Sequence, residues 1–170
     1  TIKKLKKTPN NFGVEIDLRS NKKNIYLNHN PYEGGESLVK WIKHYKHKLI
    51  VLNVKEEGLE EEIIKILNRN NIKKFFFHDQ TFSSLLKSMG KTSVSIRYSE
   101  FEDLRKTNFL FKKIKWVWID NFNEIKLEKK FYKKLRENKV KICIVSPELV
   151  KIKRVREIKK VYSFLKKKNF

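Results

Sequence analysis

Short apolar runs alternate with amphipathic stretches along the chain, and this alternation predicts strands that are each followed by a helix. Six core strands are predicted, at residues 13–19, 48–55, 73–79, 93–98, 115–120 and 140–145. Helices are predicted at residues 36–46, 59–70, 82–89, 101–112, 127–138 and 151–168. The end of a helix at residues 1–7 and a further extended run at 25–29 complete the pattern. Such βα alternation favours a parallel sheet with right-handed crossovers.

The first predicted strand, GVEIDLR at residues 13–19, carries two carboxylates. Glu15 and Asp17 alternate with apolar residues, and side chains two apart lie on one face of a strand, so both carboxylates point the same way. Parallel carboxylates repel each other unless a proton or a cation lies between them, and a hard divalent ion bound by oxygens is the usual resolution. Arg19 continues the polar face and is the alternative cation. The other alternative is a half-exposed strand whose carboxylates lie in solvent.

His29 follows Asp17 by twelve residues, in the sequence His-Asn-Pro at the end of the extended run. Pro31 stops the strand directly after it. The imidazole is therefore expected at a strand end, where sites on parallel sheets collect. Two carboxylates and an imidazole brought together in this way suit a metal-assisted site.

These residues carry a resemblance to a known family. GVEIDLR followed by a strand that ends in HNP resembles the glycerophosphodiester phosphodiesterase family, related to the phosphatidylinositol-specific phospholipases C, whose pattern is E-x-D followed by a strand ending in H-D-P. The run KLIVLNVK is similar to that family's I-E-x-K strand, and the specific motifs lie between residues 13 and 55. There are two departures. Asn53 stands where the family has a metal-binding glutamate, and no histidine precedes His29, although the family's first strand carries a catalytic His-Arg.

The resemblance implies an α/β fold of the TIM-barrel type, with eight parallel strands. This chain would open with the first helix of that barrel and close with the last but one, so the first and eighth strands are expected to be missing. Residues 1–170 are then a single, incomplete β/α barrel domain and a fragment of a longer chain. A six-stranded open sheet of the doubly wound kind is the alternative.

The resemblance also implies a metal-dependent phosphodiester hydrolase that cleaves a small glycerol-, inositol- or sugar-type phosphodiester. Glu15, Asp17 and Asn53 would hold Mg²⁺ or Ca²⁺, which neutralises charge on the phosphate. His29 would act as general acid on the leaving alkoxide. Substrate contacts are expected from residues at the ends of the later strands, namely Lys55, His78, Arg97 and Asp120.

Two of these substrate contacts have structural alternatives. Lys55 would pair with the phosphate as a point charge, and its alternative is a surface lysine beside Glu56 and Glu57. His78, next to Asp79, is either an additional substrate contact or a histidine satisfied at a strand end.

The formal net charge is +22, from 41 Lys and Arg against 19 Asp and Glu. Such a charge ordinarily suggests nucleic acid or an anionic membrane as a partner. The lysines are spread through every predicted helix instead of one stripe, which favours a solvated surface. The alternative function is a catalytically inactive barrel relic that binds nucleic acid or a lipid headgroup through its basic surface, including the predicted helix 151–168.

A single cysteine, Cys143, lies in an apolar predicted strand and cannot form an internal disulfide. A buried strand thiol fits a reducing cytoplasm, so a cytoplasmic location is expected. No stretch approaches the roughly 20 apolar residues that a transmembrane helix needs. The oligomeric state is left open by the sequence.

Overall fold

The structure is a computed structural model, and it describes most of the chain. The described residues are 1–21, 24–102, 110–120, 122, 129–146, 149, 158–160, 162–163 and 166. They belong to two compact units, Thr1–Ser95 and Ile96–Phe170, and each unit is described by itself. The expectation of one barrel domain stays a prediction.

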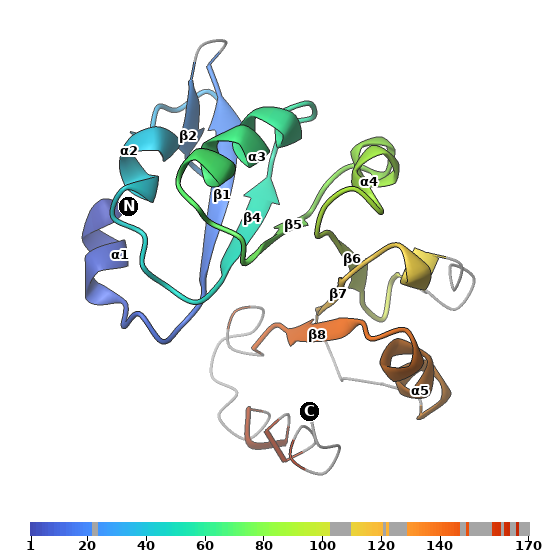
Figure 1. Ribbon diagram of the computed structural model, residues 1–170. Coiled ribbons are helices and arrows are strands. Elements are labelled where there is room, and N and C mark those ends of the chain that lie inside the picture. Colours follow the sequence, from blue (N-terminus) through green and yellow to red (C-terminus); the bar gives the residue numbers. More distant parts are fainter. Residues whose placement is uncertain are drawn as a thin grey trace. The chain divides into compact units, whose positions relative to one another are not determined.

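The first unit is built on a five-stranded sheet with helices between its strands (Figure 1). Its elements are α1 (Ile2–Lys7), β1 (Val14–Ser20), β2 (Ile25–Leu27), β3 (Glu36–Ser37), α2 (Leu38–Ile42), β4 (Ile50–Val54), α3 (Glu60–Arg69), β5 (Phe75–His78) and α4 (Phe82–Ser88). The strand order is β3-β2-β1-β4-β5. β4 pairs in parallel with both β1 and β5, whereas β2 runs antiparallel to β1 and to β3.

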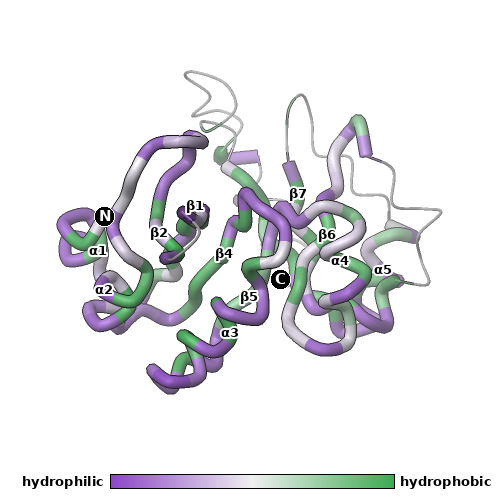
Figure 2. Tube along the Cα trace, turned by 90° about the horizontal axis from the view of Figure 1, so that it is seen from above, coloured by the Kyte–Doolittle hydropathy of each residue, from purple (hydrophilic) through white to green (hydrophobic). Residues whose placement is uncertain are grey.

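The core of this unit lies where the helices cover one side of the sheet. Figure 2 shows α2 and α3 on the same side of β1 and β4. β1 buries its alternate residues Ile16 and Leu18, while β4 is buried at every position, as expected of a strand covered on both faces. α3 buries Ile63, Ile66 and Leu67, at the three- and four-residue spacing of an amphipathic helix.

A hairpin joins β1 to β2, and it determines which residues lie beside β1 in the sheet. The register pairs Leu18 with Leu27 and Ser20 with Ile25. The turn is closed by Asn21, whose N–H donates to Asn24 O at 3.2 Å and whose Oδ1 accepts from Asn24 N at 3.1 Å. The residues after β2 therefore run back along β1 toward its middle.

The second unit contains a three-stranded sheet with the order β6-β7-β8. Its elements are β6 (Ser95–Tyr98), which begins at the last residue of the first unit, β7 (Trp116–Ile119), α5 (Lys129–Glu137) and β8 (Lys141–Ile144). β7 and β8 are parallel, with Val117 opposite Ile142. Phe131 and Leu135 of α5 are buried, four residues apart on one side of that helix.

The predicted α/β class with parallel strands is confirmed, and each of the six predicted core strands has a counterpart in β1, β4, β5, β6, β7 or β8. The strands of the described residues form two sheets and no closed barrel, so the barrel and its missing first and eighth strands stay predictions. The helix expected at 36–46 is wrong in extent. Glu36 and Ser37 pair with Leu27 and Tyr26 as an edge strand, and the helix spans only Leu38–Ile42.

Other expectations concern two helices, the burial of Cys143, the cellular location and a membrane-crossing helix. The helices predicted at 101–112 and 151–168 fall largely outside the described residues. Cys143 of β8 is not in a disulfide and is only partly buried, and the cytoplasmic location stays a prediction. Across the described part of the chain, no helix combines the length and apolarity needed to cross a membrane.

Candidate functional site

Strand register places three polar residues in one row across the first sheet. Asp17 of β1 lies opposite Asn53 of β4, and Asn53 lies opposite His78 of β5. Paired residues of neighbouring strands share a face, and Glu15 lies two residues before Asp17, so all four belong to the same face. The predicted alternation of β1 is confirmed, because Ile16 and Leu18 are buried while Glu15 is exposed and Asp17 is half-buried.

Asn53 joins this row to Glu15 and keeps one atom unused. Its Nδ2 donates to Glu15 Oε1 at 3.0 Å. The residue is only 8% exposed, and its Oδ1 is buried with no hydrogen-bond partner among the described residues. A buried acceptor without a partner costs about 1–3 kcal/mol, so such atoms are rare and call for an explanation. The amide of Asn53 thus contacts the Glu15 carboxylate through Nδ2 and keeps its oxygen unused.

Asp17 has two cationic or potentially cationic neighbours. Its Oδ1 lies 3.4 Å from Lys55 Nζ, and its Oδ2 lies 3.4 Å from His29 Nδ1. Lys55 also pairs with Asp79, whose Oδ2 lies 3.1 Å from Nζ. The Lys55 side chain is 16% exposed and is held by Asp17 and Asp79, while its predicted contact with a phosphate stays a prediction.

The hairpin, and not a parallel strand end, brings His29 to Asp17. β2 is antiparallel and ends at Leu27, and Asn28 N donates to Asp17 O at 3.2 Å. Arg19 then holds the backbone of His29, because its Nε and Nη2 donate to His29 O at 3.1 and 2.9 Å. The side chain of His29 remains 74% exposed. The position of His29 was thus predicted correctly for a physical reason that was wrong.

Arg19 also has a different role from the one considered for it. Its Nη1 lies 3.8 Å from Glu56 Oε1, while Glu56 Oε2 accepts from Ser20 N at 3.0 Å and Ser20 Oγ at 2.7 Å. Arg19 and Glu56 thereby connect the far end of β1 to the segment after β4. The cation beside the Glu-x-Asp pair is Lys55 instead.

Two cavities lie in the first unit near these residues. One, of about 330 Å³, is lined by Val54, Lys55, Glu56, Glu57, Glu60, Asp79, Gln80, Thr81 and Ser84. The other, of about 580 Å³, is lined by Arg19, Ser20, Asn21, Tyr26, Pro31, Tyr32, Glu33, Gly34 and Glu56. In the smaller cavity, hydrogen bonds from Thr81 and Ser83 lower the pKa of Glu57, with a further contribution from the charge of Lys87. Glu57 is therefore an acceptor that is already occupied.

His78 is buried, with 2% of its surface exposed. Its Nδ1 lies 3.0 Å from Ser95 Oγ, and that hydroxyl donates to Phe77 O at 3.1 Å. Because the single hydroxyl proton of Ser95 is used on Phe77, Nδ1 of His78 must be the donor to Ser95. This contact fits the satisfied strand end, and a substrate contact by His78 stays a prediction.

Arg97 and Asp120 lie in the second unit and pair with each other. Arg97 Nε is 3.0 Å from Asp120 Oδ2, and Trp118 Nε1 donates to Asp120 Oδ1 at 3.1 Å. The Asp120 side chain is 12% exposed, so its charge is compensated within the unit. Their predicted role as substrate contacts stays a prediction.

A metal ion at the predicted ligand set would need the amide of Asn53. Among the described residues, no group of three or more His, Cys, Asp and Glu side chains is placed to hold a metal ion. Glu15, Asp17 and Asn53 nevertheless form a set of oxygen donors of the kind that Mg²⁺ and Ca²⁺ prefer. The unpartnered Oδ1 of Asn53 supports this fit, because a rotation of the amide by half a turn brings Oδ1 to the Glu15 side.

From the sequence, Arg19 was considered only as the cation beside Glu15 and Asp17, Asp79 only together with His78, and Glu56 only as a neighbour of Lys55. The pairing of Lys55 with Asp17 could have been found, because Lys55 lies two residues beyond Asn53 and therefore on the face of Asp17. The contribution of Asp79 had a weaker signal, its place directly after the neighbouring strand.

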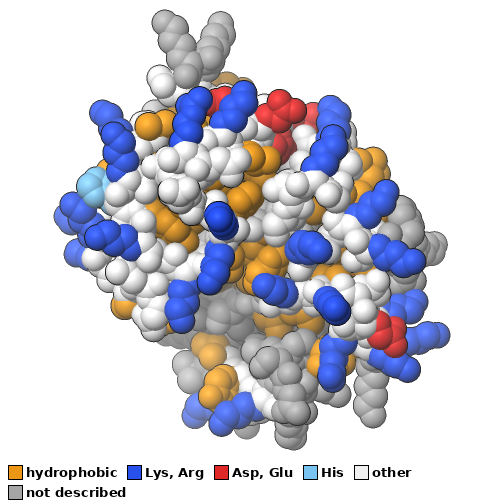
Figure 3. All heavy atoms as spheres, viewed as in Figure 1, with side chains coloured by type: hydrophobic (Ala, Val, Ile, Leu, Met, Phe, Trp, Pro, Cys, Tyr) orange, Lys and Arg blue, Asp and Glu red, His pale blue; other side chains and the backbone are white. Residues whose placement is uncertain are grey.

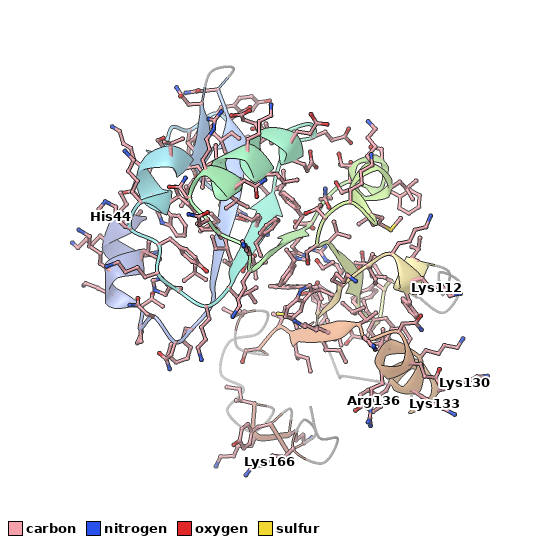
Figure 4. The ribbon with its side chains drawn as sticks, viewed as in Figure 1. His44, Lys112, Lys130, Lys133, Arg136 and Lys166 are labelled. Atoms are coloured by element: carbon pink, nitrogen blue, oxygen red, sulfur yellow. The ribbon has the colours of Figure 1, made fainter. Side chains whose placement is uncertain are left out.

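Basic side chains are spread over several elements of the described chain. On the face drawn in Figure 3, Lys and Arg are scattered between apolar and neutral patches. Lys130, Lys133 and Arg136 are exposed, and Figure 4 shows them projecting outward from α5. The predicted basic helix at 151–168, on which the anion-binding alternative depends most, lies largely outside the described residues.

Comparisons with known proteins bear on the fold. No family model matches the chain, and there is no significant match among curated proteins. Among solved structures, the chain is similar to the crystal structure of a "Putative glycerophosphoryl diester phosphodiesterase" from Agrobacterium tumefaciens, with 13% sequence identity and a TM-score of 0.55. The match covers 78% of this chain and 72% of that chain. At this identity the likeness shows a similar α/β fold, as the sequence resemblance implied.

Proposed function

We propose that this protein is a metal-assisted phosphodiester hydrolase that acts on a small glycerol-, inositol- or sugar-type phosphodiester. The observation that carries the proposal is the unpartnered, buried Oδ1 of Asn53, on the same face as Glu15 and Asp17. Two carboxylates and an unused amide oxygen, brought together by adjacent parallel strands, form a donor set for a hard divalent ion.

In this proposal Glu15, Asp17 and Asn53 hold Mg²⁺ or Ca²⁺. When bound, the ion supplies positive charge that stabilises the negative charge developing on the phosphate oxygens. Replacing a carboxylate by the amide of Asn53 removes one negative charge from the set, so weaker binding than at an all-carboxylate site is expected.

His29 is proposed as the general acid. Its Nδ1 faces Asp17 at 3.4 Å, so Asp17 orients the ring. Nε2 of the exposed ring then gives its proton to the alkoxide as the phosphorus–oxygen bond breaks. A water molecule forms the new bond to phosphorus and releases a proton to solvent, from which the ring is protonated again. The clamp of Arg19 on His29 O fixes the backbone from which the ring projects.

Lys55 is proposed to bind the phosphate. Its ammonium lies 3.4 Å from Asp17, on the same face of the sheet as the proposed ligands. Support for a phosphodiester comes from the similar fold of the glycerophosphoryl diester phosphodiesterase structure, and the cavities of about 330 and 580 Å³ offer room for the alcohol groups.

The test is hydrolysis of a panel of glycerophosphodiesters, with an inositol and a sugar phosphodiester included, in Mg²⁺ or Ca²⁺ and in chelator. Metal-dependent release of the alcohol is expected from the wild type. Glu15→Gln and His29→Gln are expected to lower kcat by about 10²-fold or more, in line with the loss of a general acid or a metal ligand.

Glu62→Gln is the matched control, because Glu62 is an exposed carboxylate on α3 that pairs with Lys65 at 3.4 Å, away from this network. It should keep wild-type turnover. A wild type without metal-dependent turnover of any phosphodiester on the panel would contradict the proposal.

A further inference from the structure

Lys55 lies between two carboxylates that come from different parts of the first unit. Its Nζ is 3.4 Å from Asp17 Oδ1 and 3.1 Å from Asp79 Oδ2. Asp17 belongs to β1, whereas Asp79 directly follows β5, so the ammonium bridges the two strands that flank β4. Each of the two Asp side chains is about 30% exposed, and Lys55 is less exposed than either, at 16%.

This arrangement creates a conflict at Asp17, on the assumption that the proposed function holds. Asp17 is a proposed ligand of a divalent ion, and it is also a counter-ion of Lys55. A divalent ion on Asp17 would repel the ammonium at that short distance. Among the described residues, the second carboxylate paired with Lys55 is that of Asp79, which is outside the proposed ligand set and can keep the ammonium compensated.

We propose that Asp79 is a positioning residue: it keeps the Lys55 ammonium paired when Asp17 binds a divalent ion. Lys55 is then a built-in cation that competes with the metal for Asp17, and Asp79 sets the outcome of that competition. The backbone at this position suits an Asp, because Asp79 has a φ of 61°, in the left-handed region that non-glycine residues adopt infrequently. Asp is among the side chains that tolerate it best.

Removing either partner of the pair should shift metal affinity in opposite directions. Lys55→Met deletes the competing cation, so Mg²⁺ or Ca²⁺ should bind about tenfold more tightly. Asp79→Asn leaves Lys55 with Asp17 as its remaining carboxylate, so metal should bind about tenfold more weakly. If Asp79 acts through Lys55, the effect of Asp79→Asn should shrink to about threefold or less in the Lys55→Met background.

The experiment is calorimetric titration of the full chain with Mg²⁺ and with Ca²⁺, for the wild type, the two single variants and the double variant. Glu57→Gln is the matched control, because Glu57 lines the same cavity as Lys55 and Asp79 but bonds Thr81 and Ser83. It removes the same negative charge and should change affinity by about twofold or less. Asp79→Glu keeps the carboxylate and should restore most of the affinity. Equal effects of Asp79→Asn with and without Lys55 would overturn the inference.

A second measurement needs no metal and separates this inference from the proposed function. In an NMR spectrum of the Lys ammonium nitrogens, wild-type Lys55 should give a signal protected from exchange by its two ion pairs. Asp79→Asn should lose that protection and Asp79→Glu should keep it. Unchanged protection in Asp79→Asn would overturn the inference. Absence of Mg²⁺ and Ca²⁺ binding by the wild type would overturn the proposed function, and the NMR result would then decide on Asp79 alone.

Discussion

The two faces of the first sheet differ in how completely their side chains are satisfied. On one face, Ile16, Leu18 and Leu52 are buried to 8% exposure or less and carry no polar atom. On the other face, Asn53 is just as buried but keeps an oxygen without a partner. The same strands form both faces, so the difference in hydrogen bonding comes from the side chains at these positions and not from the fold.

Under the proposed function, this difference separates a face that stabilises the fold from a face that carries the chemistry. Apolar burial stabilises a fold directly, whereas a buried polar atom without a partner costs stability unless something binds it. Proteins keep such costs mainly at functional sites. The proposed metal site accounts for the unused oxygen on the face of Glu15, Asp17 and Asn53.

The largest expected effect is on stability, at Leu52 on the apolar face. Leu52→Ala removes a fully buried side chain in the middle of β4, and the resulting cavity should lower the free energy of unfolding by about 2–5 kcal/mol. Metal affinity should not change in the fraction that is folded, because Leu52 belongs to the opposite face from Asn53. Denaturant unfolding and calorimetry with Mg²⁺ measure the two properties separately.

Glu15→Ala is the complement of that variant. Glu15 is exposed but accepts from Asn53 Nδ2 at 3.0 Å, so Glu15→Ala should lower the unfolding free energy by about 0.5–1.5 kcal/mol, less than Leu52→Ala, while metal binding should be lost. If Leu52→Ala is too unstable to study, Leu52→Val replaces it in the comparison, because it creates a smaller cavity. A loss of stability in Glu15→Ala as large as that of Leu52→Ala would mean that the carboxylate is structural.

An intermediate effect is expected at Asn53 itself. Asn53→Asp removes the hydrogen bond to Glu15 and places a second carboxylate beside it, so the protein without metal should lose roughly 1–3 kcal/mol of unfolding free energy. A divalent ion resolves the repulsion, so millimolar Mg²⁺ or Ca²⁺ should recover most of the loss. Thermal unfolding with metal and with chelator measures the recovery.

Asn70→Asp is the control for this exchange. Asn70 Nδ2 donates to Ile66 O at 2.8 Å at the end of α3, so the same substitution also removes one hydrogen bond and adds one charge. It should show no recovery with metal. Equal recovery in both variants would indicate a general effect of divalent ions on a charged surface.

The sequence predicted the parts of this site that depend on local periodicity. Alternation in residues 13–19 was enough to place Glu15 and Asp17 on one face, and the apolar run at 48–55 was enough to place Asn53 on the neighbouring parallel strand. Contacts that depend on tertiary arrangement were not predictable in the same way. The antiparallel return of β2, which brings His29 to Asp17, follows from a hairpin register that neighbouring residues do not encode by period alone. The pairing of Lys55 with Asp79 depends likewise on which strands are neighbours.

The smallest expected effect concerns a second buried atom without a partner, the hydroxyl of Tyr45. Its Oη is buried without a hydrogen bond in the described part of the unit, and the ring stacks on Trp41 at 5.8 Å. Burial raises the pKa of Tyr45 from 10.0 to about 12. The unfolded chain therefore releases this proton before the folded protein does, so unfolding free energy should fall between about pH 10 and about pH 12.

Tyr45→Phe tests whether this atom differs from Oδ1 of Asn53. The Tyr45 hydroxyl has no hydrogen-bond partner among the described residues, so its removal should leave metal binding unchanged and stability at neutral pH equal or slightly higher. Lysines also titrate above pH 10, so the measurement is the difference between wild type and variant, which should change by on the order of 1 kcal/mol across that range. If Tyr45→Phe abolished metal binding, removal of the Tyr45 hydroxyl would have the effect expected of Asn53. The difference between the two faces of the sheet would then not indicate a metal site at Asn53.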